Sequence, residues 1–161
     1  MLLRIFTVEE IETEIFKGKK RKQDFPEVIE FPFSEQYKHI VTQITTTEIS
    51  SETVLYHSVE AINENKGFDL FDYWCFGGNG QGDRWFLNKK DRVFFYDHDY
   101  DERLEPMYIS FEQWLKMAFV IKQLDQSFDE FGLIPESVKQ KFYETLNSIH
   151  PTLSENYPFS V

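Results

Sequence analysis

Cysteine is nearly absent from this chain. Cys75 is the single cysteine among 161 residues, so no disulfide can form within the chain and cysteines cannot build a zinc cluster. It lies between Trp74 and Phe76, in a stretch with the composition of a buried strand. We therefore expect Cys75 to be a small core residue, because a nucleophilic thiol needs an exposed, electropositive setting.

Long apolar runs are also missing. No segment approaches the ~20 consecutive apolar residues that a membrane-spanning helix needs. The N-terminal segment reaches Glu9 and Glu10 after only a few apolar residues, which is unlike a secretion signal. Together with the lone cysteine, these features predict a cytoplasmic location and no membrane partner.

Positive charge is scarce as well. The chain has 17 Lys and Arg against 28 Asp and Glu, a formal net charge of −11 at pH 7. A surface of this sign repels phosphate backbones and anionic lipids, which argues against nucleic acid as a partner. It attracts basic protein domains and accelerates their association. The same charge would also keep the protein soluble, and composition does not separate these two interpretations.

Aromatic residues, in contrast, are abundant. The 17 Phe, 8 Tyr and 3 Trp make up 17% of the chain, which excludes intrinsic disorder. Rings carry a large apolar area and favour strands, so we expect a core in which aromatic side chains pack against a sheet.

The predicted elements run in the order helices, sheet, helices. Two capping boxes mark helix starts, Thr7 with Glu10 and Ser110 with Gln113, and Gly132 is placed to end a helix. The patterns predict helices over residues 8–16, 34–44, 58–65, 111–131 and 135–149, strands over 54–56, 68–76, 84–87, 92–96 and 107–109, and a polar connector over 45–51. We predict a single α+β domain spanning residues 1–161, with an antiparallel, aromatic-rich sheet flanked by N-terminal and C-terminal helices.

A glycine run, GGNGQGD, invites comparison with phosphate-binding loops. Gly77 and Gly82 have the P-loop spacing, but Asp83 stands where that loop needs a lysine, and its carboxylate would repel phosphate. The dinucleotide-binding fingerprint fails too, since the run does not open a helix. We expect a turn whose glycines permit positive φ.

An acidic loop over residues 97–105 is the second motif that suggests chemistry. Asp97, Asp99 and Asp101 match the first ligands of an EF-hand, but Glu102 replaces its glycine and its twelfth position is not a glutamate. His98 could form half of a metal or acid–base site, for which the sequence supplies no other half. We expect no metal, no cofactor and no catalytic residue; a small hydrolase using His98 and this loop is a minor alternative.

From Gly77 to Leu115 the motifs follow a recognisable order: a glycine-rich turn entering Gly-Asp, an aromatic strand, a polar turn, an aromatic strand ending in YDHD, the acidic loop, and SFEQWL opening a helix. This block resembles the SUKH superfamily. The matching positions are Gly80, Gly82, Asp83, Trp85, Val93, Tyr96, Asp97, His98, Ser110, Phe111 and Leu115. Residues 32–41 and 56–65 are similar to further family segments, whereas Thr45–Thr46–Thr47 stands where the family usually has Asn-Gly-Gly.

The resemblance implies a non-enzymatic α+β domain that binds another protein. The superfamily includes bacterial immunity proteins, which neutralise a toxin in the cytoplasm, and the Smi/Knr-type regulators of yeast cell-wall synthesis. We therefore expect an immunity protein for a basic, nuclease-like toxin, with a regulatory protein-binding module as the alternative. The expected contact residues are the five carboxylates of the acidic loop: Asp97, Asp99, Asp101, Glu102 and Glu105. If the acidic loop makes no contact with the partner, we expect the acidic stretch between Asp24 and Asp72 to form the interface.

Overall fold

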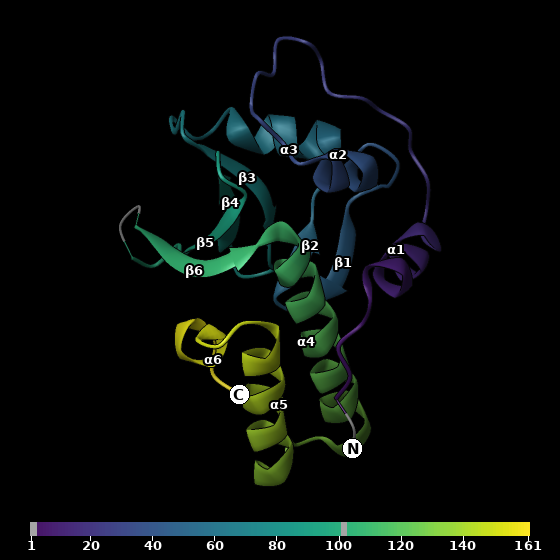
Figure 1. Ribbon diagram of the computed structural model, residues 1–161, viewed down its shortest axis with the longest axis vertical. Helices are drawn as coiled ribbons and strands as arrows, with labels where there is room; N and C mark the ends of the chain where they lie inside the picture. The colour runs from purple at the N-terminus through teal and green to yellow at the C-terminus, as the bar shows by residue number, and fades with distance from the viewer. Residues whose placement is uncertain (1–2, 101–102) are drawn as a thin grey trace.

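One antiparallel sheet of six strands organises the computed structural model, which describes residues 3–100 and 103–161 (Figure 1). The order of the strands across the sheet equals their order in the chain, so the sheet is a simple meander. The strands are β1 (Thr47–Ser50), β2 (Thr53–Leu55), β3 (Tyr73–Gly78), β4 (Arg84–Asn88), β5 (Arg92–Tyr96) and β6 (Leu104–Ser110). The prediction of an α+β domain with an antiparallel, aromatic-rich sheet is confirmed.

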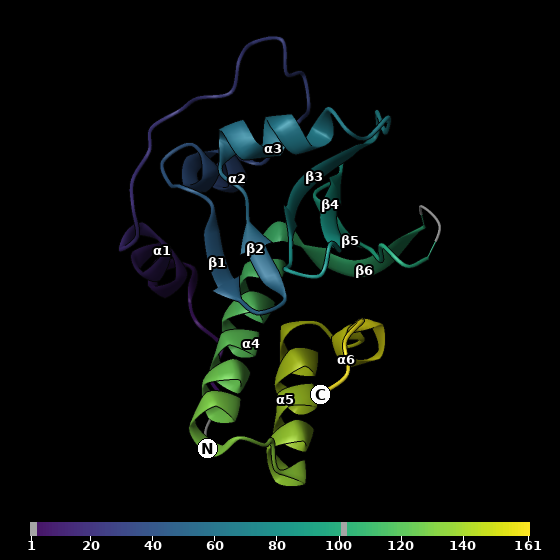
Figure 2. The same ribbon diagram turned by 180° about the vertical axis from the view of Figure 1, so that it is seen from behind.

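Helices lie on both sides of this sheet (Figures 1 and 2). They are α1 (Val8–Phe16), α2 (Glu35–Val41), α3 (Ser58–Asn65), α4 (Phe111–Phe131), α5 (Glu136–Ile149) and α6 (Leu153–Asn156). α4 begins at the end of β6 and extends well past the sheet, where α5 runs beside it. None of the helices in the described ranges has the length and apolar character required to cross a bilayer.

Local signals account for both ends of the longest helix. Ser110 accepts a hydrogen bond from the backbone N–H of Gln113, and the Gln113 side chain accepts one from the backbone N–H of Ser110, as predicted. Gly132 ends the helix at φ 71°, in the left-handed region that glycine tolerates best. The capping box of Thr7 and Glu10 at α1 is confirmed as well.

Several predicted strand boundaries were wrong. The supposed connector over residues 45–51 contains β1, which pairs with β2 and packs against α4, so tertiary contacts make a strand of it. β3 begins only at Tyr73, and residues 68–72 form a loop. β6 is longer than residues 107–109 because it pairs with β5 along most of its length.

The predicted helices also need corrections. α2 ends at Val41, since Ile44 instead forms an isolated antiparallel bridge with Lys20. The N-cap of α3 is His57 rather than Ser58, whose hydroxyl donates to the backbone carbonyl of Gln23 at 2.6 Å. The pattern also gave no sign of the short helix α6, which follows Pro151.

Both faces of the sheet are buried, as neighbouring residues of β4 show. Trp85 points toward α4 and the C-terminal segment, with ring centroids 5.9 Å from Trp114 and 6.1 Å from Phe159. Phe86 points to the opposite face, 5.1 Å from Phe68. Trp85 and Phe86 are both fully buried.

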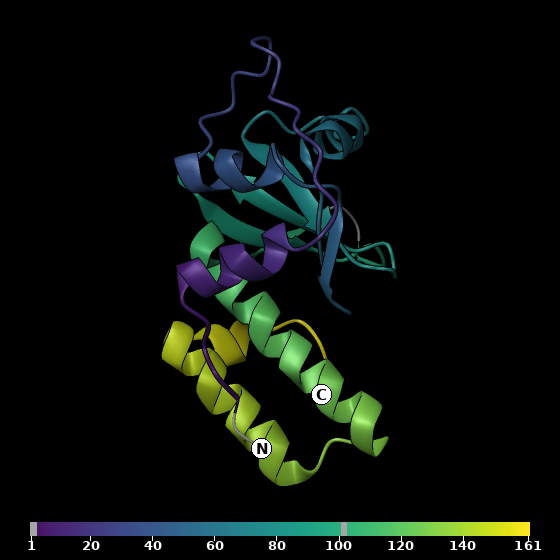
Figure 3. The same cartoon turned by 90° about the vertical axis from the view of Figure 1, so that its right-hand side faces the viewer.

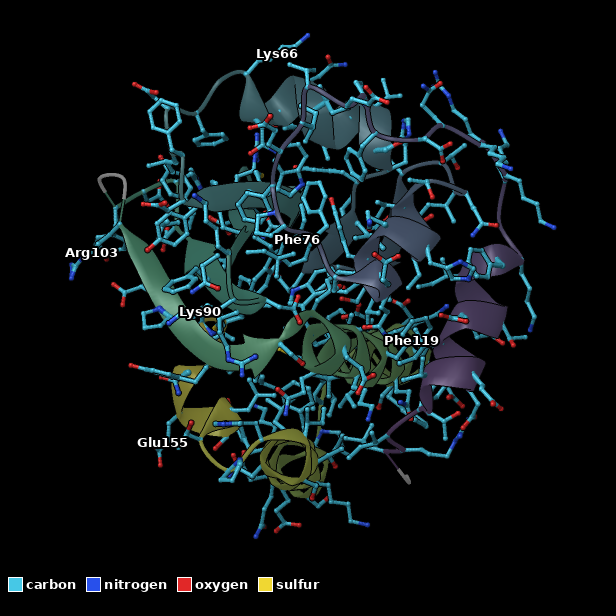
Figure 4. The ribbon with its side chains drawn as sticks, turned by 45° about the horizontal axis from the view of Figure 1, so that its top comes forward. Lys66, Phe76, Lys90, Arg103, Phe119 and Glu155 are labelled. Atoms are coloured by element: carbon cyan, nitrogen blue, oxygen red, sulfur yellow. The ribbon has the colours of Figure 1, made fainter. Side chains whose placement is uncertain are left out.

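An aromatic cluster joins α2, β3 and α4. Phe76, near the centre of Figure 4, packs edge-on against Trp114 with centroids 4.8 Å apart. The buried Tyr37 of α2 accepts a hydrogen bond from the indole nitrogen of Trp74 at 2.9 Å and lies 5.2 Å from Phe111. On the opposite face, α3 is tied to β3 through Asn65, whose amide exchanges two hydrogen bonds of 2.8 Å with the backbone of Cys75.

We expect Trp85→Ala to lower the free energy of unfolding by about 3–5 kcal/mol, because it leaves a cavity in the core. Urea denaturation of both proteins would measure the change. Phe71→Ala is the matched control, since Phe71 is 86% exposed and its loss should cost under about 0.5 kcal/mol. Equal costs for the two variants would contradict the assignment of Trp85 to the core.

Candidate functional site

Asn79 organises the turn between β3 and β4. Its side-chain oxygen accepts hydrogen bonds from the backbone N–H groups of Gln81 at 3.0 Å and Asp83 at 3.1 Å. Its amide nitrogen donates to the carboxylates of Asp83 at 2.9 Å and Glu52 at 3.0 Å. The glycine run is thus a turn built around a central asparagine, which the glycine pattern alone did not reveal.

Asp83 is the buried anchor of the site. Only 5% of the residue is exposed, and its Oδ1 accepts hydrogen bonds from the backbone N–H of His98 at 3.2 Å and from the His98 ring Nδ1 at 2.7 Å. Burial alone would raise the pKa of Asp83, but the hydrogen bonds from His98 and Asn79 outweigh burial and lower the pKa. Asp83 is therefore an anion held by the residues around it.

His98 lies between two carboxylates. Its Nδ1 meets Asp83, and its Nε2 lies 3.2 Å from Oδ1 of Asp99. The hydrogen bond joins Nδ1 to Asp83, whereas the contact with Asp99 is an ion pair that forms when the ring is protonated. The hydrogen bond to Asp83 raises the pKa of His98, and the charge of Asp99 raises it further. We name this arrangement the His98 clasp: an imidazole ring that joins the acidic loop to the β3–β4 turn.

The clasp holds the first part of the acidic loop. Asp97 is half-buried, and its Oδ1 accepts the backbone N–H of Asp99 at 2.9 Å. Glu105, on β6, is exposed and lies 3.5 Å from Arg103, which projects at the outer end of β6 in Figure 4. The two remaining predicted contact residues, Asp101 and Glu102, lie outside the described residues.

The structure also supplies the partner that His98 lacked in the sequence. Asp83, Asp97 and His98 bring potential ligand atoms within 4.8 Å of one another. The 2.7 Å between Asp83 and His98 is a hydrogen-bond distance, whereas two ligands about 2.0 Å from a tetrahedral zinc ion lie roughly 3.3 Å apart. With both ring nitrogens facing carboxylates, the geometry suits a clasp better than an ion site or a general base. That no metal binds stays a prediction.

Other residues that carry the resemblance to the SUKH superfamily have structural roles. Trp85 is buried, and its indole N–H donates to the backbone carbonyl of Glu52 at 2.9 Å. Ser110 caps α4, and Phe111 is fully buried beside Tyr37. Two glycines shape the turn, Gly82 at φ 95° and the exposed Gly80.

Two residues that the sequence did not single out, Glu52 and Asn79, complete the site. Hydrogen bonds connect Glu52, Asn79, Asp83 and His98, and an ion pair extends the series to Asp99; we call this series the polar chain. The Asx turn of Asn79 has a signal in the sequence, an asparagine amid glycines. Glu52 has no such signal in the sequence, because it reaches Asn79 only through the pairing of β2 with β3.

Comparisons with protein-family models, with curated proteins and with solved structures find no match for this chain. The residues of the site and their geometry therefore carry the functional argument.

The two turn glycines make a matched pair of variants. Gly82→Ala should cost about 1–2 kcal/mol of unfolding free energy, because its φ of 95° strains any residue with a Cβ. A Cβ added at Gly80 meets no atom within 4 Å, so Gly80→Ala should change stability by less than about 0.5 kcal/mol. Thermal melting would measure both. An equal loss in the two variants would contradict a special role for the backbone of Gly82.

The His98 clasp predicts a defined pH dependence. The raised pKa of His98 gives stability that is present below its ordinary value of 6.5 and is lost as pH rises through the folded-state pKa. The lowered pKa of Asp83 gives stability that is present above 3.8 and is lost at lower pH. The difference in unfolding free energy between the parent protein and His98→Gln should therefore be larger at pH 5.5 than at pH 8.5. A difference independent of pH would show that His98 contributes no charge to the clasp.

Proposed function

We propose that this protein is a non-enzymatic immunity protein of the SUKH type, which binds and neutralises a basic, nuclease-like protein toxin in the cytoplasm. The observation that carries the proposal is the acidic loop, held at one end of a rigid sheet by the His98 clasp. A loop that presents negative charge from a fixed scaffold suits recognition of a cationic protein surface.

Charge and architecture support the same proposal. The net charge of −11 gives a long-range attraction to basic partners, and the α+β fold agrees with what the resemblance implies. Asp99 and Glu105 are exposed, so a partner can approach them directly. Neighbouring carboxylates repel one another, and a cationic partner would relieve that repulsion.

The chemistry of the candidate nucleophile and base favours binding over catalysis. Burial raises the pKa of the Cys75 thiol to about 12, which leaves it un-ionised at neutral pH. Both nitrogens of His98 face carboxylates, and no described serine or cysteine is hydrogen-bonded to its ring. Nucleophile and base are thus not brought together around His98.

The test is to measure binding to basic secreted toxins encoded beside the gene for this protein. Replacing Asp99, Asp101 and Glu102 together by Ser should slow association by about tenfold at low salt, with a smaller change in dissociation. The same variant should protect cells less well when the toxin is expressed. Surface plasmon resonance at several salt concentrations and growth assays provide the two measurements.

A matched control separates the loop from overall charge. Glu9→Gln, Glu136→Gln and Glu144→Gln together remove three exposed carboxylates outside both the acidic loop and the stretch between Asp24 and Asp72, and should change association by less than about twofold. Equal effects of the two triple variants would mean that the loop makes no specific contact. Tight binding to a partner that harms no cell would instead favour a regulatory module.

A further inference from the structure

A groove separates the β1–β2 hairpin from the C-terminal half of α4. Its third wall is formed by Tyr157, Phe159, Ser160 and Val161 of the C-terminal segment, whose end overlaps α4 in Figure 3. The groove encloses about 730 Å³, within the range of protein ligand sites. It is distinct from the acidic loop, although Glu52 belongs both to its wall and to the polar chain.

The floor of the groove is apolar. Ile121 and Leu124 of α4 lie buried beneath it, and Phe128 of α4 and Phe159 of the C-terminal segment supply its accessible apolar surface. Phe128 is 49% exposed within the groove. Phe131, at the end of α4, and Leu133, which follows the helix, are exposed as well. Large exposed apolar side chains that gather in one place mark interaction surfaces.

The walls of the groove are acidic. Glu48, Glu52, Asp125 and Asp129 line it with a single cation, Lys122, which gives a local net charge of −3. Within residues 3–100 and 103–161, none of these four carboxylates has a cationic nitrogen within 4.0 Å. An apolar floor with acidic walls complements a segment that is basic on two sides and apolar on the third.

The walls are held in place before any partner binds. The carboxylate of Asp125 accepts hydrogen bonds from the backbone N–H of Ser51 at 2.8 Å and from its hydroxyl at 2.9 Å, which ties the hairpin tip to α4. The backbone carbonyl of Glu52 accepts the indole N–H of Trp85, and its side chain accepts the amide of Asn79. Such preorganisation reduces the entropy lost on binding.

The position of the Glu52 carboxylate lowers the stability of the folded protein. Burial raises the pKa of Glu52, and the negative charges of Asp83 and Asp125 raise it further, against the hydrogen bond from Asn79. An ionised Glu52 at neutral pH therefore opposes folding. A cationic side chain in the groove would offset this repulsion, and functional sites are where such costs are usually found.

We propose that this groove is a docking site for a basic amphipathic helix of a protein partner. The exposed Phe128 and the half-buried Phe159 offer the apolar contact for a helix laid in the groove, with its Lys and Arg side chains directed at the acidic walls. The inference does not depend on the acidic loop, because different residues carry it. A partner could use one surface or both.

The probe is a fluorescein-labelled 15-residue peptide made of Leu and Lys, spaced to form a helix with one apolar and one basic face. Fluorescence anisotropy should give saturable binding, and amide NMR shifts should map to the hairpin tip, α4 and residues 157–161. Glu48→Gln, Glu52→Gln and Asp129→Asn together should weaken binding about tenfold. Phe128→Ser should weaken it several-fold without any change in charge.

Two controls make the test specific. Glu27→Gln, Glu30→Gln and Asp69→Asn remove the same charge elsewhere and should leave the affinity within about twofold. A scrambled peptide of the same composition, with no apolar face, should bind at least about tenfold more weakly. Folding is checked by Glu52→Gln alone, which should raise the melting temperature at pH 7 because it removes the repulsion.

Four results would overturn the inference, three of them in the binding experiments. These are equal affinities for the groove and control triple variants, equal binding of the scrambled peptide, and NMR shifts confined to other surfaces. A fourth is a dimer in sedimentation that is broken by Phe128→Ser, since a second copy would then occupy the groove. No toxin is used, so failure here is separate from failure of the proposed function. Loss of toxin binding in the loop variant alone would leave the groove result unchanged.

Discussion

The burial of Trp85 is the constraint on which the rest of the structure depends. Its ring contacts Trp114 of α4 and Phe159 of the C-terminal segment, so one side chain places both against the sheet. Its indole N–H would be costly to bury without a partner, and it finds one in the backbone carbonyl of Glu52. The hairpin tip that carries Glu52 is therefore positioned by the core itself.

The polar chain begins where this core ends. Asp83, directly before Arg84 and Trp85, is a nearly buried carboxylate that is tolerated because His98 and Asn79 donate to it. The same hydrogen bonds orient the acidic loop on one side and Glu52 on the other. Two acidic surfaces thus share one set of hydrogen bonds, which explains how a chain of net charge −11 can hold carboxylates close together in a defined geometry.

How far sequence reasoning reaches depends on the range of the interaction. The capping boxes at Thr7 and Ser110, the left-handed Gly132 and the positive φ of Gly82 were all predictable, since each depends on residues within one turn. Strand β1 was not predictable, because its four residues have moderate strand propensity and form a strand only when β2 and α4 pack against them. β6 was underestimated for a similar reason, since pairing with β5 extends it.

The sequence by itself determined an acidic, aromatic-rich α+β domain and identified Asp97 and His98 as residues worth attention. Only the tertiary structure decided that Asp83 pairs with His98 and that Ser51 meets Asp125, 74 positions apart in the chain. The physical reason is that the pattern of side chains along the sequence predicts only the local backbone conformation and the face of each element that is buried. The closeness of distant charges is instead set by how α4 packs on the sheet, and that packing is a property of the whole core.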